Sequence, residues 1–149
     1  MREKQKLGWK EWCRFPRLDI PAIKAKIDTG AKTSALHAFN ISTFEVDGRR
    51  WVRFKVHPVQ RKRKPEFECH LPLIEMKEVR SSNGLSEMRY VVETEVALGA
   101  QGKAFKTRMT LTNRDAMGFR MLVGRNTLKR YLVDPAASYL LGQPDPDNC

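Results

Sequence analysis

The sequence has few cysteines and no long apolar run. Its 149 residues include three cysteines, Cys13, Cys69 and Cys149, which are widely spaced and odd in number. They form neither a disulfide framework nor a Cys-x-x-Cys pair, a pattern that suits a reducing cytoplasm. No stretch approaches the ~20 apolar residues of a membrane-spanning helix. The first residues are charged and lead into no apolar segment, so we expect no secretory signal.

Several motifs of familiar enzymes are also missing. The sequence contains no Gly-x-x-x-x-Gly-Lys-Ser/Thr phosphate loop, no His-Glu-x-x-His zinc motif and no Gly-x-Ser-x-Gly nucleophile elbow. His37, His57 and His70 are not spaced to form a ligand set with the cysteines. Cys69 and His70 are neighbours, and neighbours in a strand face opposite sides. We therefore expect no metal and no cofactor.

Acidic residues are scarce relative to basic ones. The chain has 28 Lys and Arg against 17 Asp and Glu, and a formal net charge of +11. The excess is densest between residues 48 and 65, where no acidic residue occurs. The run Arg61–Lys64 fits a solvated loop, or a surface for a polyanion such as an acidic peptide or nucleic acid. Aromatic residues are sparse around this run, so nucleic-acid binding is not favoured.

Apolar residues alternate with polar ones over most of the chain, which is the period of β-strands. Residues 44–56 alternate around Asp47-Gly48, a pair typical of hairpin turns. A second hairpin is predicted over 90–111, with its turn at 99–102. A further strand is predicted over Ile20–Ile27, with its apolar residues on one face and its lysines on the other.

One short helix is predicted near the C-terminus. An apolar run at 121–123 leads into a helical segment, Gly124–Leu132, which Asp134-Pro135 ends. Residues 139–141 fit a final strand.

No internal repeat or linker divides the chain. We expect one all-β domain over residues 8–141, with flexible tails at 1–7 and 142–149.

The most informative feature is a pair of motifs that each follow an apolar strand. The segment 27–31, Ile-Asp-Thr-Gly-Ala, places Asp28 at the end of the first strand. The segment 121–126, Met-Leu-Val-Gly-Arg-Asn, leads from the second strand into the helix. Asp-Thr-Gly alone is weak, because an Asp at a strand end often closes a local turn. The two motifs together, in an all-β chain, are much more specific.

With these motifs the sequence resembles the retropepsin-like aspartic proteases. It is most similar to a bacterial family of small retropepsin-like proteins that are often labelled ATP-dependent zinc proteases. The resemblance spans nearly the whole chain, and its segments are 27–38, 79–84, 111–115, 117–125 and 132–135. It implies a closed β-barrel with one short C-terminal helix. The label itself does not fit, because the nucleotide and zinc motifs are missing.

The resemblance also implies a partner and a substrate class. Genes of the family are often found beside ATP-grasp glutamate ligases of the RimK type, which add glutamates to a ribosomal protein. Such a ligase is therefore an expected partner, and acidic or polyglutamylated peptides are expected substrates. This is an association between genes and does not define a mechanism.

The resemblance implies peptide hydrolysis with Asp28 as the catalytic residue. Two carboxyl groups about 3 Å apart cannot both ionise, so they share one proton and act as base and acid. This chain has one Asp-Thr-Gly motif. A working pair then requires two copies of Asp28, which a symmetric homodimer supplies.

The neighbouring residues take supporting roles in this family. Thr29 is expected to hydrogen-bond across the two-fold axis, and Gly30 lets the two backbones approach closely. Ala31 completes the loop. Gly124 and Arg125 are expected to pack behind it, with Arg125 as a structural brace.

The chain departs from the viral enzymes at one position beside the loop. Those enzymes carry an acid two residues after the motif's glycine, where it pairs with the later arginine, and here that position is Lys32. Arg125 needs another partner, and both Asp115 and Asp134 are candidates.

The Gly-rich flap of the viral enzymes is also missing as a motif. Residues 80–84 are the best candidate for a lid over the site, and they fit an ordinary loop equally well. The substrate-binding candidates are Lys32, Arg80, Ser81, Ser82 and Asn83. If Lys32 and Arg80 face the cleft, they favour an acidic substrate.

The sequence thus predicts a cytoplasmic, homodimeric aspartic peptidase with no metal. One alternative is a catalytically silent binding module that holds an acidic tail or RNA on its basic face. Another is a partner of a glutamate ligase that acts by contact alone.

Overall fold

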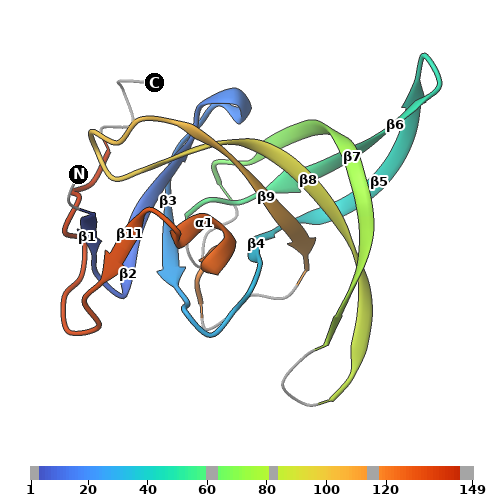
Figure 1. Cartoon of the computed structure of the whole chain (residues 1–149). Helices are drawn as coiled ribbons and strands as arrows, with labels where there is room; N and C mark the ends of the chain where they lie inside the picture. The colour runs from blue at the N-terminus through green and yellow to red at the C-terminus, as the bar shows by residue number, and fades with distance from the viewer. Residues whose placement is uncertain (1–3, 60–63, 81–83, 114–117, 145–149) are drawn as a thin grey trace.

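The computed structural model describes residues 4–59, 64–80, 84–113 and 118–144. These ranges form a mostly β protein (Figure 1). The strands are β1 (Gln5–Leu7), β2 (Lys10–Phe15), β3 (Ile20–Ile27), β4 (Ser34–His37), β5 (Phe39–Val46), β6 (Arg49–Val56), β7 (Phe67–Arg80), β8 (Ser86–Leu98), β9 (Phe105–Thr112), β10 (Met121–Val123) and β11 (Tyr131–Val133). The helices are the 3-10 helix η1 (Pro16–Leu18) and α1 (Arg125–Leu128). No helix in these ranges is long and apolar enough to cross a membrane.

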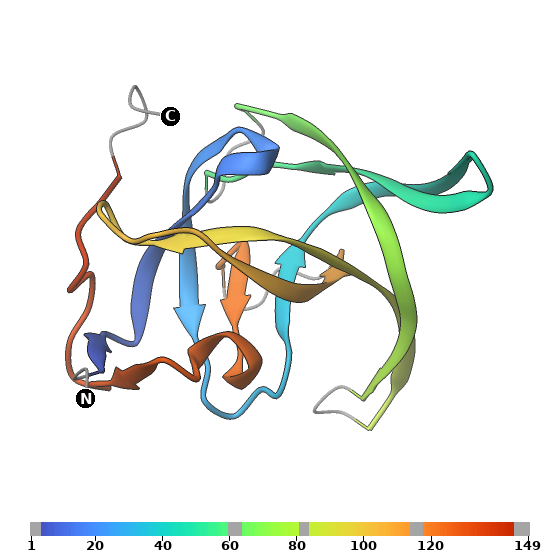
Figure 2. The ribbon, with the colours of Figure 1, turned by 45° about the horizontal axis from the view of Figure 1, so that its top comes forward.

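Six strands close into a barrel. They are hydrogen-bonded in the order β2-β3-β10-β4-β9-β8, and β8 pairs again with β2 through Cys13 opposite Leu98. Closure removes the exposed edges that an open sheet would present. The predicted all-β barrel with one short C-terminal helix is therefore confirmed (Figure 2).

Both predicted hairpins are present. β5 and β6 turn at Asp47 and Gly48, whose positive φ angles of 51° and 80° suit a two-residue turn. β8 and β9 form the second hairpin, with the turn that the sequence predicts. β7, β6 and β5 continue the sheet beyond β8, and the β5–β6 hairpin extends away from the barrel (Figures 1 and 2).

The C-terminal region differs from the prediction in two ways. The helix ends at Leu128 rather than Leu132, because Tyr131–Val133 forms β11, which pairs in parallel with β1. Residues 139–141 form a turn instead of a strand, because the amide of Leu141 donates to the side chain of Glu11 and not to a neighbouring strand.

The N-terminal strand β1 lies wholly within residues 1–7, the segment that the sequence predicts to be a flexible tail. Residues 5–7 form β1, and the side chain of Leu7 is completely buried. Burial of this leucine in the core holds the strand in place.

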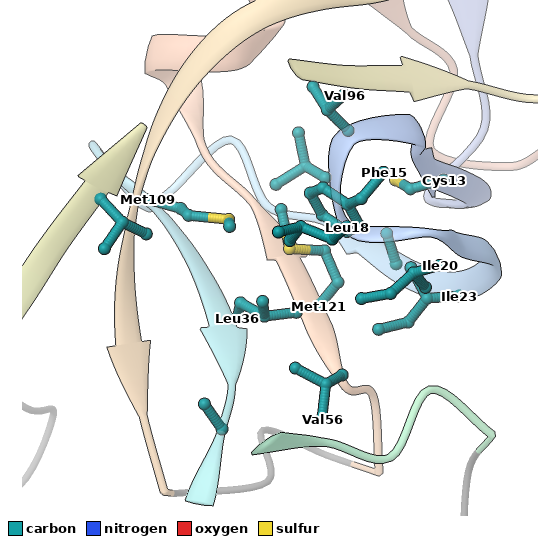
Figure 3. Packing of buried hydrophobic residues seen from close by; sticks show 14 of the residues in the cluster. Cys13, Phe15, Leu18, Ile20, Ile23, Leu36, Val56, Val96, Met109 and Met121 are labelled. Atoms are coloured by element: carbon teal, nitrogen blue, oxygen red, sulfur yellow. The ribbon is translucent and has the colours of Figure 1, made fainter. Parts of the chain in front are cut away.

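The barrel interior is filled by the apolar faces of its strands. In β3 the buried residues Ile23, Ala25 and Ile27 alternate with half-buried lysines, as predicted. Figure 3 shows Phe15 and Met121 among the side chains that meet in the centre. The core thus fixes which way residue 28 leaves β3.

The buried thiols allow a first prediction. Cys13 and Cys69 are free and buried, and burial raises the pKa of both thiols, that of Cys69 to about 12. Very little reactive thiolate forms at pH 8. In a Cys149→Ser variant we expect a disulfide reagent to label these two thiols only after unfolding. Rapid labelling of the native protein would contradict this burial.

A buried carboxylate ties the C-terminal segment to the barrel. Glu11 in β2 is completely buried, and its Oε2 accepts hydrogen bonds from the amides of Gly8 at 2.7 Å and Leu140 at 2.9 Å. Its Oε1 accepts a third from the amide of Leu141 at 3.2 Å. Three donors around one buried anion satisfy its hydrogen-bonding needs.

Candidate functional site

The two sequence motifs lie side by side because their strands are parallel neighbours. Ile27 at the end of β3 pairs with Val123 at the end of β10. The amide of Asp28 then donates to the carbonyl of Val123 at 2.9 Å. Asp28 and Gly124 therefore leave the sheet at the same end of the barrel, where α1 lies beside the loop between β3 and β4 (Figure 2).

The loop 28–33 is closed by local hydrogen bonds. The amide of Gly30 donates to Asp28 Oδ1 at 2.9 Å, and the amide of Ala31 donates to the carbonyl of Asp28 at 3.2 Å. Asp28 is half-buried, whereas Thr29 and Gly30 are exposed. In the single chain, the Asp-Thr-Gly motif therefore faces solvent.

The same local turn occurs at a second aspartate. Asp134, which follows β11, accepts a hydrogen bond at Oδ1 from the amide of Ala136 at 2.9 Å. The turn at Asp28 is therefore not evidence of catalysis. What distinguishes Asp28 is the second motif packed against its loop.

Gly124 lets the helix start contact the loop directly. A Cβ on Gly124 would lie 2.7 Å from the carbonyl carbon and oxygen of Thr33, closer than real Cβ atoms approach. Behind this contact, the amide of Arg125 donates to the Ala31 carbonyl at 2.8 Å. The amide of Asn126 donates to the Lys32 carbonyl at 3.0 Å. The first turn of α1 thus holds the loop through backbone groups.

The side chain of Arg125 also reaches the loop. Its guanidinium donates to the carbonyl of Thr29 at 2.9 Å. Of the two carboxylates that were candidates for its partner, Asp115 lies outside the described residues. Asp134 accepts from Ala136 instead, and Arg125 has no ion pair within the described ranges. The viral enzymes pair this arginine with an acid at the position of Lys32. Here the arginine pairs with the backbone carbonyl of Thr29 instead.

A buried hydroxyl network supports the same junction, and sequence reasoning did not identify it. The hydroxyl of Ser34 accepts from the Gly124 amide at 3.0 Å and lies 2.6 Å from the hydroxyl of Thr127. Thr127 also contacts Thr107 at 2.7 Å. The side-chain oxygen of Asn126 accepts from the Ser34 amide at 3.0 Å. Neither Ser34 nor Thr127 carries a sequence signal, because hydroxyl residues are common at exposed positions too.

Two of the five substrate-binding candidates lie within the described residues. Lys32 is exposed on the loop itself, and Arg80 is exposed at the end of β7. Ser81, Ser82 and Asn83 lie outside the described residues. One further cation contacts the loop: the ammonium of Lys77 in β7 donates to Thr33 Oγ1 at 3.0 Å.

Part of the positive charge of the basic segment 48–65 is paired with carboxylates. Arg53 lies 3.7 Å from Glu68, and Lys55 lies 3.5 Å from Glu66. The hydrogen bond with His57 is the largest effect that lowers the pKa of Glu66 below its usual value. Arg61–Arg63 lie outside the described residues. Elsewhere in the described ranges, no three His, Cys, Asp or Glu side chains gather as metal ligands would.

The contact at Gly124 leads to a prediction. Gly124→Ala is expected to lower the free energy of unfolding by about 1–3 kcal/mol, because the added methyl group pushes against the backbone of Thr33. Hydrogen exchange of the Arg125 and Asn126 amides should speed up. In Gly48→Ala the added Cβ meets open space and strains only the turn between β5 and β6, where φ is 80°, so these two amides should stay protected. Unchanged protection in Gly124→Ala would contradict the packing.

The chain is similar to part of longer proteins that are named as ligases. The chain is 47% identical over 138 residues to a probable alpha-L-glutamate ligase of Shewanella pealeana, a match that covers 92% of this chain and 30% of the relative. A probable alpha-L-glutamate ligase of Desulfotalea psychrophila is 48% identical over 141 residues, 94% of this chain and 30% of the relative. The chain thus spans about 30% of the length of these curated relatives.

A solved structure matches over the whole barrel. It is a Legionella pneumophila protein of unknown function, with a TM-score of 0.75 and 26% identity over 93% of this chain and 99% of that one. The family model for the retropepsin-like aspartic endopeptidase RimB matches residues 6–144. This chain therefore belongs to the RimB-like family of retropepsin-like aspartic endopeptidases.

Proposed function

We propose that this protein is an aspartic-type peptidase that acts as a homodimer, with Asp28 of each copy in one shared site. The observation that carries the proposal is the junction of the two motifs. Asp28 lies on a solvent-facing loop, and the start of α1 holds that loop through Gly124 and Arg125. A loop braced in this way keeps a carboxyl group in one position, as catalysis requires.

The second carboxyl group of the site comes from a second chain in this proposal. Within the described ranges, the side chain of Asp28 has the Gly30 amide as its partner and no carboxyl group within hydrogen-bond distance. Thr29 and Gly30 are exposed, so the loop is open to an identical loop across a two-fold axis. A symmetric contact of this kind uses the same surface twice.

The paired carboxyl groups would hydrolyse a peptide bond without a covalent intermediate. One carboxylate accepts a proton from water as the oxygen attacks the carbonyl carbon, and the protonated carboxyl group donates its proton to the carbonyl oxygen. The C–N bond of the tetrahedral intermediate then breaks as the amine nitrogen gains the proton that was taken from water. A hydroxyl of the intermediate gives its proton to the other carboxylate as the new carboxyl group forms, which restores the pair with one shared proton. The titration belongs to the pair rather than to either residue.

We also propose acidic peptides as substrates and the cytoplasm as the compartment. Lys32 and Lys77 lie on or against the loop, and the chain carries a net charge of +11. Such a surface attracts acidic chains. The free thiols of Cys13 and Cys69 are compatible with a reducing compartment.

A second candidate function rests on the names of the relatives. Proteins about three times as long as the matched segment are named probable alpha-L-glutamate ligases, so the domain in them is part of a longer ligase-named chain. This favours a role beside a glutamate ligase, as a partner that acts by contact. An effect on ligase activity that survives Asp28→Asn would support this candidate over the peptidase.

Light scattering and peptide hydrolysis over a range of protein concentrations test the proposed function together. We expect a dimeric mass at high concentration. Activity per chain should fall on dilution below the dissociation constant, because each site needs two chains. A monomeric mass at every concentration, with activity per chain unchanged on dilution, would contradict the shared site.

A further inference from the structure

Lys77 places a cation on the candidate active loop from a distant part of the chain. It lies in β7, and its ammonium donates to the hydroxyl of Thr33, a residue 44 positions away. Thr33 belongs to the loop 28–33, and its carbonyl lies against Gly124. The lysine therefore contacts the loop that carries Asp28 at the point where the second motif braces it.

The charge of Lys77 has no carboxylate partner within the described ranges. Its cross-strand neighbour is Arg89, and Glu87 on this face of the hairpin forms an ion pair with Arg89. Glu75, two residues before Lys77 on the same face of β7, is exposed and forms no ion pair with Lys77. Two cations opposite one another in a sheet repel unless an anion lies between them. An ammonium has three donors, and the neutral hydroxyl of Thr33 uses one.

Alternation along β7 separates Lys77 from Arg80. Lys77 and Val79 are half-buried, whereas Glu78 and Arg80 are exposed. Side chains of one parity share a face of a strand, so Lys77 is on the face turned to the barrel and Arg80 is on the opposite face. Of the two basic residues, Lys77 is the one that contacts the active loop.

We propose that Lys77 forms a subsite for one acidic side chain of a bound peptide. This inference rests on the proposed function, because it assumes that peptides lie across the loop 28–33. A carboxylate at this position replaces water on the two free donors of the ammonium. It also separates the charges of Lys77 and Arg89. A neutral side chain at the same position leaves the cation uncompensated, so the subsite discriminates by charge.

Binding to an Asp28→Asn protein tests the subsite without turnover. The probes are two labelled octapeptides, one of alternating alanine and glutamate and one of alternating alanine and glutamine. We expect the glutamate peptide to bind more tightly. Lys77→Gln should weaken its binding about tenfold and remove the difference between the peptides, whereas Lys77→Arg should retain it.

The matched control is Lys103→Gln, which removes the same charge. Lys103 is exposed in the turn after β8, at the end of that strand remote from Arg89. It should change the affinity for the glutamate peptide by less than twofold. Equal effects of the two substitutions, or equal affinity of the Asp28→Asn protein with Lys77 intact for both peptides, including no measurable binding of either, would overturn the subsite.

Hydrolysis of the same peptides, measured beside their binding, separates this inference from the peptidase proposal. If Asp28→Asn hydrolyses peptides as fast as the native sequence, the peptidase proposal fails whatever Lys77 does. If Asp28→Asn stops hydrolysis and Lys77→Gln leaves the choice between the two peptides unchanged, the subsite alone fails.

Discussion

Asp28→Asn is expected to reduce peptide hydrolysis at least about a hundredfold. The amide is the same size as the carboxyl group but cannot take a proton from water, and general acid–base catalysis contributes about 10²–10⁴. The fold should be preserved, because the side-chain oxygen of the substituted asparagine can still accept from the Gly30 amide. Hydrolysis is measured by mass spectrometry of the products, and the melting temperature confirms folding.

Asp134→Asn is the matched control for this substitution. Asp134 also follows an apolar strand and accepts a hydrogen bond from the amide two residues later, at the same distance of 2.9 Å as at Asp28. It differs in having no second motif packed behind it. Its hydrolysis rate should stay within about twofold of the native rate. Equal losses in both variants would show that the turn, and not the carboxyl group at residue 28, is what matters.

Glu11→Ala is expected to be the most destabilising of the substitutions considered. It leaves the amides of Gly8, Leu140 and Leu141 without their acceptor, and each buried unpaired donor costs about 1–3 kcal/mol. We expect a loss of about 3 kcal/mol or more, and a fall in melting temperature of about 10 °C. Chemical denaturation measures the free energy of unfolding.

A second measurement locates the effect of Glu11→Ala. Hydrogen exchange at Leu140 and Leu141 should become fast, because the C-terminal segment loses its attachment to β2. Glu45→Ala, at an exposed position of β5, should change the free energy of unfolding by less than about 0.5 kcal/mol. A Glu11→Ala protein as stable as Glu45→Ala would show that the buried carboxylate contributes nothing to the fold.

Sequence patterns over a few residues predicted strands and turns, because the conformation of these elements depends mainly on neighbouring residues. Alternation identified the strand Ile20–Ile27, and Asp47-Gly48 identified a hairpin turn that requires two positive φ angles. The helix after Gly124 was predicted too long, because Tyr131–Val133 prefers to pair with β1 at the other end of the chain. A pairing of that kind is invisible in a local window.

One part of the candidate site was predicted from local sequence motifs, and another part was not. The motifs at Asp28 and Gly124 identified a junction that the structure brings together through strand pairing. Other contacts join residues that no local pattern relates. Lys77 contacts Thr33 across 44 positions, Ser34 contacts Thr127 across 93, and Glu11 binds Leu140 across 129. Such contacts can be identified only from the folded barrel, because they join residues that are far apart in the sequence.

The most direct test of the shared site mixes native chains with Asp28→Asn chains. After subunit exchange at equal amounts, about one quarter of the dimers contain two native chains, about half are hybrids and the rest are fully mutant. If each site needs both copies of Asp28, activity falls to about 25% of that of native protein at the same total concentration. Activity of about 50% would mean that each chain carries its own site, and would contradict the shared pair.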